Sequence, residues 1–109
     1  MKKLPCLAAA LAAIAFSVST AQAASFNCRY AKLPAEVAIC DDAELEQLDE
    51  DMSRIYFRIL EVAEGADRAE LKRTQRRFIA KRNACGYNDG CIARAYERRI
   101  EFLENNYGD

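Results

Sequence analysis

The chain has 109 residues, with 16 basic side chains, 17 acidic side chains and no histidine, and its formal net charge is −1. Without histidine it lacks the commonest catalytic base and the nitrogen ligand of most zinc sites, which argues against an enzyme and against a metal protein. The length allows one small domain, and a core of that size buries too little surface to be stable without reinforcement.

Residues 1–23 have the pattern of a cleavable export signal. Two lysines precede an apolar run over residues 7–16, and Ala21 and Ala23 place small side chains at the positions that a signal peptidase reads. The apolar run is too short to span a bilayer. Cys6 lies before this run, unlike the anchor cysteine of a lipoprotein. We therefore predict a signal peptide, and a periplasmic or secreted product that is not a lipoprotein and has no stable membrane insertion.

The remaining residues, 24–109, read as one all-helical domain. Pro34 can open a brief helix to Cys40, because its missing N–H costs nothing in a first turn. The stretch Asp41-Asp42-Ala43-Glu44 has the spacing of a capping box, and apolar residues then recur with helical periodicity.

The rest of the chain predicts two further long helices. Gly65 ends the preceding helix, and Asp67 can cap the next one, which runs to about Cys85. Residues 86–90 are rich in turn-forming residues, and Gly108 lies past the end of the last helix. The expected fold is all-α: a small bundle of three helices with a short additional N-terminal helix.

Four cysteines follow the signal, at positions 28, 40, 85 and 91. In an oxidising compartment they predict two disulfides, for which three pairings are possible. Closeness in sequence favours Cys28–Cys40 and Cys85–Cys91, and each closed loop would stabilise the fold by roughly 2–3 kcal/mol. The spacings do not match those of zinc sites, so we expect no metal and no cofactor.

Charge is divided along the chain. Residues 36–64 hold ten acids and two arginines, whereas residues 68–99 hold ten bases and three acids. This division predicts two antiparallel helices that attract each other. A nucleic-acid partner for the basic half is disfavoured, because an exported chain seldom meets a phosphate backbone.

Several polar residues share helix faces with core residues, where unpaired polar groups are costly. The simplest arrangement is a network in which the carboxylate of Asp49 pairs with Arg82 or Arg99, while an amide and tyrosine hydroxyls complete the hydrogen bonds. A functional cleft built from the same side chains is the alternative. The predicted members are Asp49, Tyr56, Gln75, Arg82, Tyr96 and Arg99.

These polar and cysteine positions form a pattern that covers essentially all of residues 24–109. The pattern comprises Cys28, Glu36-x-x-Ile39-Cys40, Leu48-Asp49 with Tyr56, Gln75-x-x-Phe78-x-x-x-Arg82-x-x-Cys85, and Cys91-x-x-x-x-Tyr96-x-x-Arg99-Ile100-x-x-Leu103. It resembles the LprI-type, lysozyme-inhibitor-like domain of bacterial exported proteins. Phe78 departs from it, since the family usually has tryptophan there.

The resemblance implies a small helical domain that binds without catalysis. One founding member of the family inhibits animal-type lysozyme, and similar domains serve as immunity partners of toxins that attack the cell wall. The expected function is inhibition of lysozyme or another peptidoglycan-degrading enzyme, with that hydrolase as the protein partner. The alternative is a structural or stress-related envelope protein, or an immunity protein to a cell-wall-targeting toxin, without lysozyme activity.

Two surfaces could contact such a partner. Animal-type lysozymes are strongly basic, so an acidic helix face would speed the encounter; a solvated face is the alternative. A short disulfide-closed loop could enter an enzyme cleft at little ordering cost; a simple connector is the alternative. The acidic candidates are Glu44, Glu46, Glu50 and Asp51, and the loop candidates are Tyr87, Asn88 and Asp89.

Catalysis is disfavoured by the side chains that remain after the signal. Ser25 and Ser53 are the two serines there, and neither lies in a recognisable nucleophile setting. The acidic pair Asp41 and Asp42 is better explained as a helix cap. We therefore expect a protein that is not an enzyme.

Overall fold

A computed structural model describes residues 25–108, and the predicted signal peptide lies outside these residues. All the regular secondary structure of the described part is helical, and this part contains no strand. Its elements are a short 3₁₀-helix η1 (Cys28–Tyr30) and the α-helices α1 (Pro34–Asp41), α2 (Ala43–Val62), α3 (Gly65–Ala84) and α4 (Asp89–Tyr107). None of these helices combines the length and apolar character needed to cross a membrane.

The first two α-helices begin where local capping chemistry places them. Pro34 is the first residue of α1, and the carboxylate of Glu36 accepts a hydrogen bond from the N–H of Leu33 at 3.3 Å. Asp42 caps α2 by accepting from the N–H groups of Glu44 and Leu45, at 2.8 and 3.1 Å. The cap therefore lies one residue later than predicted: the capping-box spacing made Asp41 the cap, with Glu44 three residues on, whereas Asp41 ends α1 and Asp42 caps α2.

The turn between α2 and α3 differs from its prediction. Gly65 has a φ of +56°, a left-handed conformation that favours glycine, and it is the first residue of α3. The residue before the helix is Glu64, whose side chain makes no capping hydrogen bond. The predicted cap at Asp67 is wrong, because the helix begins earlier, at Gly65. Asp67 therefore lies inside the first turn of α3, where its negative charge interacts favourably with the helix dipole.

The connection between α3 and α4 is shorter than predicted. Gly86 has a φ of +63°, and Asn88 caps α4 by accepting from the N–H of Cys91 at 2.9 Å. This cap starts the helix at Asp89, so Gly90 belongs to the helix and not to the turn. Gly108 follows the end of α4, as expected.

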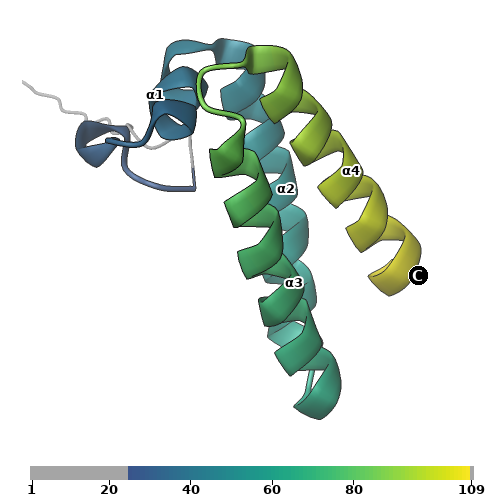
Figure 1. Ribbon diagram of the computed structural model, residues 1–109. Coiled ribbons are helices and arrows are strands. Elements are labelled where there is room, and N and C mark those ends of the chain that lie inside the picture. The colour runs from purple at the N-terminus through teal and green to yellow at the C-terminus, as the bar shows by residue number, and fades with distance from the viewer. Residues whose placement is uncertain (1–24, 109) are drawn as a thin grey trace, which may run out of the picture.

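The long helices alternate in direction, so that α2 and α4 both run antiparallel to α3 (Figure 1). Helix α4 packs along both α2 and α3, and the short α1 packs at one end of the bundle. Both predicted disulfides are present: Cys28–Cys40 joins η1 to α1, and Cys85–Cys91 closes the connection between α3 and α4. The all-helical fold is confirmed.

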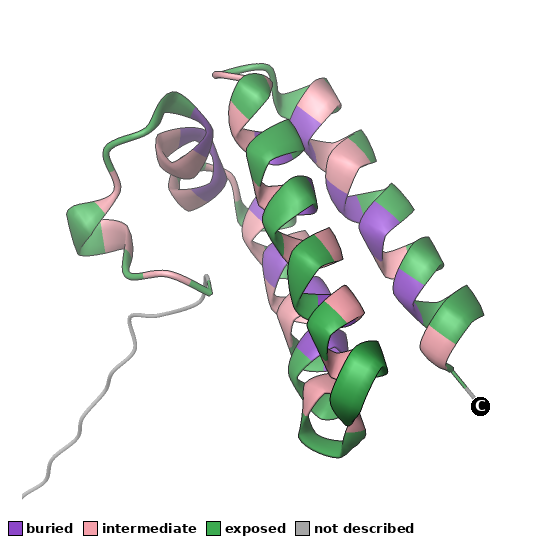
Figure 2. Ribbon diagram, turned by 60° about the horizontal axis from the view of Figure 1, so that its bottom comes forward, coloured by how far each residue is buried: buried purple, intermediate pink, exposed green. Residues whose placement is uncertain are grey.

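The core is formed by the inward faces of all four α-helices, which Figure 2 shows as buried stripes between exposed outer faces. Burial of these apolar side chains is the main favourable contribution to folding. The buried hydrophobic residues are Ala35, Ala38, Ile39, Leu45, Met52, Ile55, Tyr56, Ile59, Leu71, Phe78, Ile92, Tyr96 and Leu103.

The acidic and basic segments are antiparallel, as predicted, but ion pairs do not join them in the described part of the chain. The ion pairs there lie within one helix each, three residues apart: Arg54 with Asp51 at 2.7 Å in α2, and Arg73 with Glu70 in α3. Pairs of this kind at the surface contribute little stability. The helices are therefore held together by packing of the shared apolar core and not by attraction between the acidic and the basic segment.

Candidate functional site

A buried polar cluster is centred on Asp49 of α2. This side chain is fully buried, and its carboxylate accepts hydrogen bonds from the Tyr96 hydroxyl at 2.6 Å and from the Ser25 hydroxyl at 3.1 Å. It also accepts from the backbone N–H of Ser25. Three donors satisfy a charge that would otherwise be costly to bury.

Arg82 of α3 completes this cluster without touching the carboxylate. Its guanidinium donates to the Tyr96 hydroxyl at 3.2 Å and to the side-chain oxygen of Asn83 at 2.9 and 3.1 Å. It also lies 5.4 Å from the centre of the Phe26 ring. The predicted ion pair between Asp49 and Arg82 is wrong, because the hydroxyl of Tyr96 lies between the two charges and bonds to both.

Arg99 of α4 belongs to a second cluster. It is 5% exposed and donates to the side-chain oxygens of Gln75, at 2.9 Å, and Thr74, at 3.0 Å. Its remaining nitrogen, Nη2, is buried and has no hydrogen-bond partner among residues 25–108. Because both partners are neutral, burial lowers the pKa of Arg99 from its ordinary value. The predicted alternative pair between Asp49 and Arg99 is also wrong.

Five of the six predicted network residues thus divide into two groups. Asp49, Arg82 and Tyr96 form one, and Gln75 and Arg99 form the other. Tyr56 is buried beside them, but among the described residues its hydroxyl takes part in neither set of hydrogen bonds. Since the group around Asp49 is buried between helices, its geometry suits the fixing of helix register better than contact with a substrate, whereas Arg99 of the second group borders a groove between α3 and α4.

Alkaline pH offers a test of this burial. Burial first, and then the charge of Asp49, raise the pKa of Tyr96 above its ordinary value of 10.0. Tyr96 therefore keeps its proton in the folded protein at pH values where the unfolded chain loses it. Its contribution to the free energy of unfolding is therefore fully present below about pH 10. Above that pH the free energy of unfolding falls by up to about 1.4 kcal/mol per pH unit.

Urea unfolding gives the free energy of unfolding at about pH 9 and at about pH 11. We expect this free energy to fall less between the two pH values in Tyr96→Phe than in the unmodified protein. The other tyrosines titrate in both proteins, so their contribution cancels in the difference. Parallel stability profiles for the two proteins would show that Tyr96 is not buried beside a charged carboxylate.

The acidic candidates on α2 form a weaker patch than predicted. Glu44 is exposed, whereas Glu46, Glu50 and Asp51 are partly buried. The carboxylate of Asp51 accepts from Arg54 at 2.7 Å, and this hydrogen bond is the main reason why the pKa of Asp51 is lowered. Glu46 has a carboxylate oxygen 3.9 Å from the sulfur of Cys28. Glu44, at the start of α2, is therefore the most accessible charge of the set.

The loop candidates lie on the disulfide-closed connection between α3 and α4. Tyr87 is 69% exposed, while Asn88 and Asp89 are used to cap and begin α4. This connection and the start of α2 lie at the same end of the bundle (Figure 1). The structure thus brings the exposed loop tyrosine and the accessible part of the acidic face to one end.

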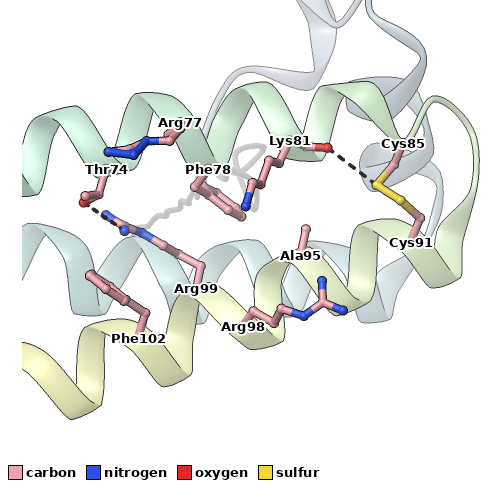
Figure 3. Close-up of a pocket in the computed structure, with 10 residues that line it drawn as sticks. All are labelled: Thr74, Arg77, Phe78, Lys81, Cys85, Cys91, Ala95, Arg98, Arg99 and Phe102. Carbon is pink, nitrogen blue, oxygen red and sulfur yellow. Dashed lines mark hydrogen bonds between the residues drawn. A yellow bond between two sulfur atoms is a disulfide. The ribbon is translucent and has the colours of Figure 1, made fainter.

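Two features were missed by the sequence analysis. The contact of Ser25 with Asp49 is one, because Ser25 precedes the first recognisable helix signal. The other is a groove of about 450 Å³ between α3 and α4 (Figure 3). Positions 74, 77, 78 and 81 of α3 and Cys85 just after it follow the i, i+3, i+4, i+7 and i+11 spacing of one helix face, which could have indicated this shared face. In the described residues, no group of three or more acidic or cysteine side chains could hold a metal ion.

Comparison with known proteins gives one result. The family model described as Lysozyme inhibitor LprI matches residues 27–103. No curated protein and no solved structure shows a significant match. The matched range includes both disulfides and all the helices up to the last buried leucine of α4, and it excludes Ser25.

Proposed function

The chain belongs to the lysozyme inhibitor LprI family, and from this membership we propose that it is a non-catalytic exported protein that inhibits a lysozyme-type or other peptidoglycan-degrading enzyme. The observation that supports this most directly is the family match over residues 27–103. The proposed location is the periplasm or the outside of the cell, which fractionation of cells expressing the full chain would test.

The end of the bundle that carries the α3–α4 loop is the proposed contact surface. Tyr87 protrudes there from a connection closed by Cys85–Cys91, so little conformational freedom is lost when it enters a cleft. Tyrosine is also among the residues that most often dominate binding energy at protein interfaces. We assign the central contact to this side chain.

The accessible carboxylate at the start of α2 has a supporting role. Glu44 is exposed at the same end of the bundle, and Asp89 is exposed in the first turn of α4. Against a basic enzyme, such charges raise the association rate more than the final affinity. Their effect should fall as salt screens exposed charges over about 10 Å.

The test is the turnover of an animal-type lysozyme on a cell-wall suspension, with and without the purified protein. We expect inhibition, and a rise of at least about tenfold in the inhibition constant for Tyr87→Ala, as for a typical interface hot spot. Tyr30→Ala is the matched control, because Tyr30 is 68% exposed, as Tyr87 is, but lies on η1. Glu44→Lys should slow association at low salt.

Equal inhibition by the Tyr87→Ala protein would move the contact surface elsewhere. If the unmodified protein inhibits neither lysozymes nor other peptidoglycan-degrading enzymes, including cell-wall-directed toxins, the proposed function is wrong. A structural or stress-related role in the envelope would then be favoured. Inhibition of a toxin alone would instead identify an immunity protein.

A further inference from the structure

The groove between α3 and α4 carries positive charge that the described residues do not neutralise (Figure 3). Arg77 and Lys81 of α3 and Arg98 of α4 are exposed along its sides. The described residues that line it include no acid. Neither of the ion pairs found in that part of the chain involves these three side chains. The groove is therefore an electrostatic match for carboxylates.

The floor of the groove is apolar. It contains the rings of Phe78 and Phe102 and the methyl group of Ala95, and the disulfide Cys85–Cys91 lies at one end. Phe102 is 38% exposed. An apolar floor between charged sides suits a ligand that carries both carboxylates and an apolar side chain.

A further positive charge lies at the edge of this floor. Arg99 lines the groove, with its guanidinium 5.5 Å from the centre of the Phe102 ring and neutral hydrogen-bond partners on the other side. Burial lowers the pKa of Arg99, which agrees with a guanidinium that has no carboxylate beside it. A carboxylate bound in the groove would supply the missing counter-charge.

The spacing of the cations indicates the form of the ligand. Arg77 and Lys81 are one helical turn apart, about 6 Å along the axis of α3. Alternate side chains of an extended peptide are about 6.6 Å apart. Two carboxylates at alternate positions of such a peptide could therefore each meet one of these cations, while the residue between them faces another side of the groove.

We infer that this groove binds an extended acidic peptide segment of a protein partner, with carboxylates on Arg77, Lys81 and Arg98 and an apolar side chain on the floor. A nucleic acid fits less well, because its affinity depends on many phosphate contacts, and this chain has an acidic α2 and a net charge of −1. The site is separate from the Tyr87 loop tip and holds whether or not the protein inhibits lysozyme.

The test is fluorescence anisotropy with a labelled peptide of alternating glutamate and phenylalanine. We expect it to bind, and the same peptide with glutamine for glutamate to bind at least about tenfold more weakly, a difference of about 1.4 kcal/mol. Lys81→Glu and Arg98→Glu should each weaken binding by about tenfold. Arg58→Glu is the matched control, because Arg58 is an exposed cation of α2 outside the groove.

A second pair of variants tests the floor independently of charge. Ala95→Trp should fill the groove and abolish binding, whereas Ala80→Trp, at an exposed position of α3 outside the groove, should not. Helical circular dichroism and the urea midpoint of each variant show that it is folded. Equal binding of the glutamine peptide, equal loss in Arg58→Glu, or tighter binding of a labelled oligothymidylate would each overturn the inference.

Discussion

Replacing Asp49 with leucine is expected to lower the free energy of unfolding by about 3–5 kcal/mol, a large share of the stability of a small domain. The substitution keeps the approximate volume but removes the acceptor of the Tyr96 hydroxyl and of both Ser25 donors. It also leaves the positive charge of Arg82, 4% exposed, without a nearby negative charge. Urea unfolding followed by helical circular dichroism measures the loss.

Two further variants separate the causes of this loss. Tyr96→Phe removes a single buried hydroxyl and should cost about 1–3 kcal/mol, because it leaves Asp49 with fewer donors. Asp51→Leu is the control for loss of an acid from α2, and should cost no more than about 1 kcal/mol, since its partner Arg54 is exposed. If Asp49→Leu were as mild as Asp51→Leu, the buried cluster would not be important for stability.

Removing the Cys28–Cys40 disulfide, by replacing both residues with alanine, is expected to cost about 3 kcal/mol. The two cysteines are separated by 12 positions, and the entropy of the unfolded chain rises when this loop is opened. The link also holds η1 beside the bundle, where Phe26 packs on Arg82 and Ser25 reaches Asp49. Loss of the link therefore weakens the same buried cluster.

The matched comparison is the removal of Cys85–Cys91, whose separation is six positions. The shorter loop predicts a cost of about 2 kcal/mol. Thermal and urea unfolding of the two double-alanine proteins gives both values under the same conditions. If removing Cys85–Cys91 lowered the free energy of unfolding more than removing Cys28–Cys40, the role assigned to Cys28–Cys40 in holding η1 beside the bundle would be contradicted.

The helices and the disulfides could be predicted because their signals are local. The apolar periodicity of α2, the proline at the start of α1 and the glycine after α4 each act within a few residues. The disulfide pairing followed from closeness along the chain. Asp67 misled the prediction because a cap requires a particular backbone conformation as well as a suitable side chain, and Gly65 began the helix before it.

The internal geometry of the candidate sites could not be predicted in the same way. Periodicity places Asp49, Arg82 and Tyr96 on inward faces, but it does not say which atoms meet. In the structure a hydroxyl separates the two charges, which removes the expected ion pair. The α3–α4 groove depends on the spacing of two helices, and a single sequence carries no direct signal of that spacing.

The exposed turn between α2 and α3 lies at the opposite end of the bundle from the α3–α4 loop (Figure 1). Glu64, Gly65 and Ala66 are exposed there, and a side chain added at Gly65 would meet no atom within 4 Å, although its φ favours glycine. A biotin or dye carried by a residue that replaces Ala66 would therefore point away from the loop tyrosine. Immobilisation through this turn leaves the opposite end, which carries the proposed contact surface, facing the solution, and this suits sensor-based searches for binding proteins.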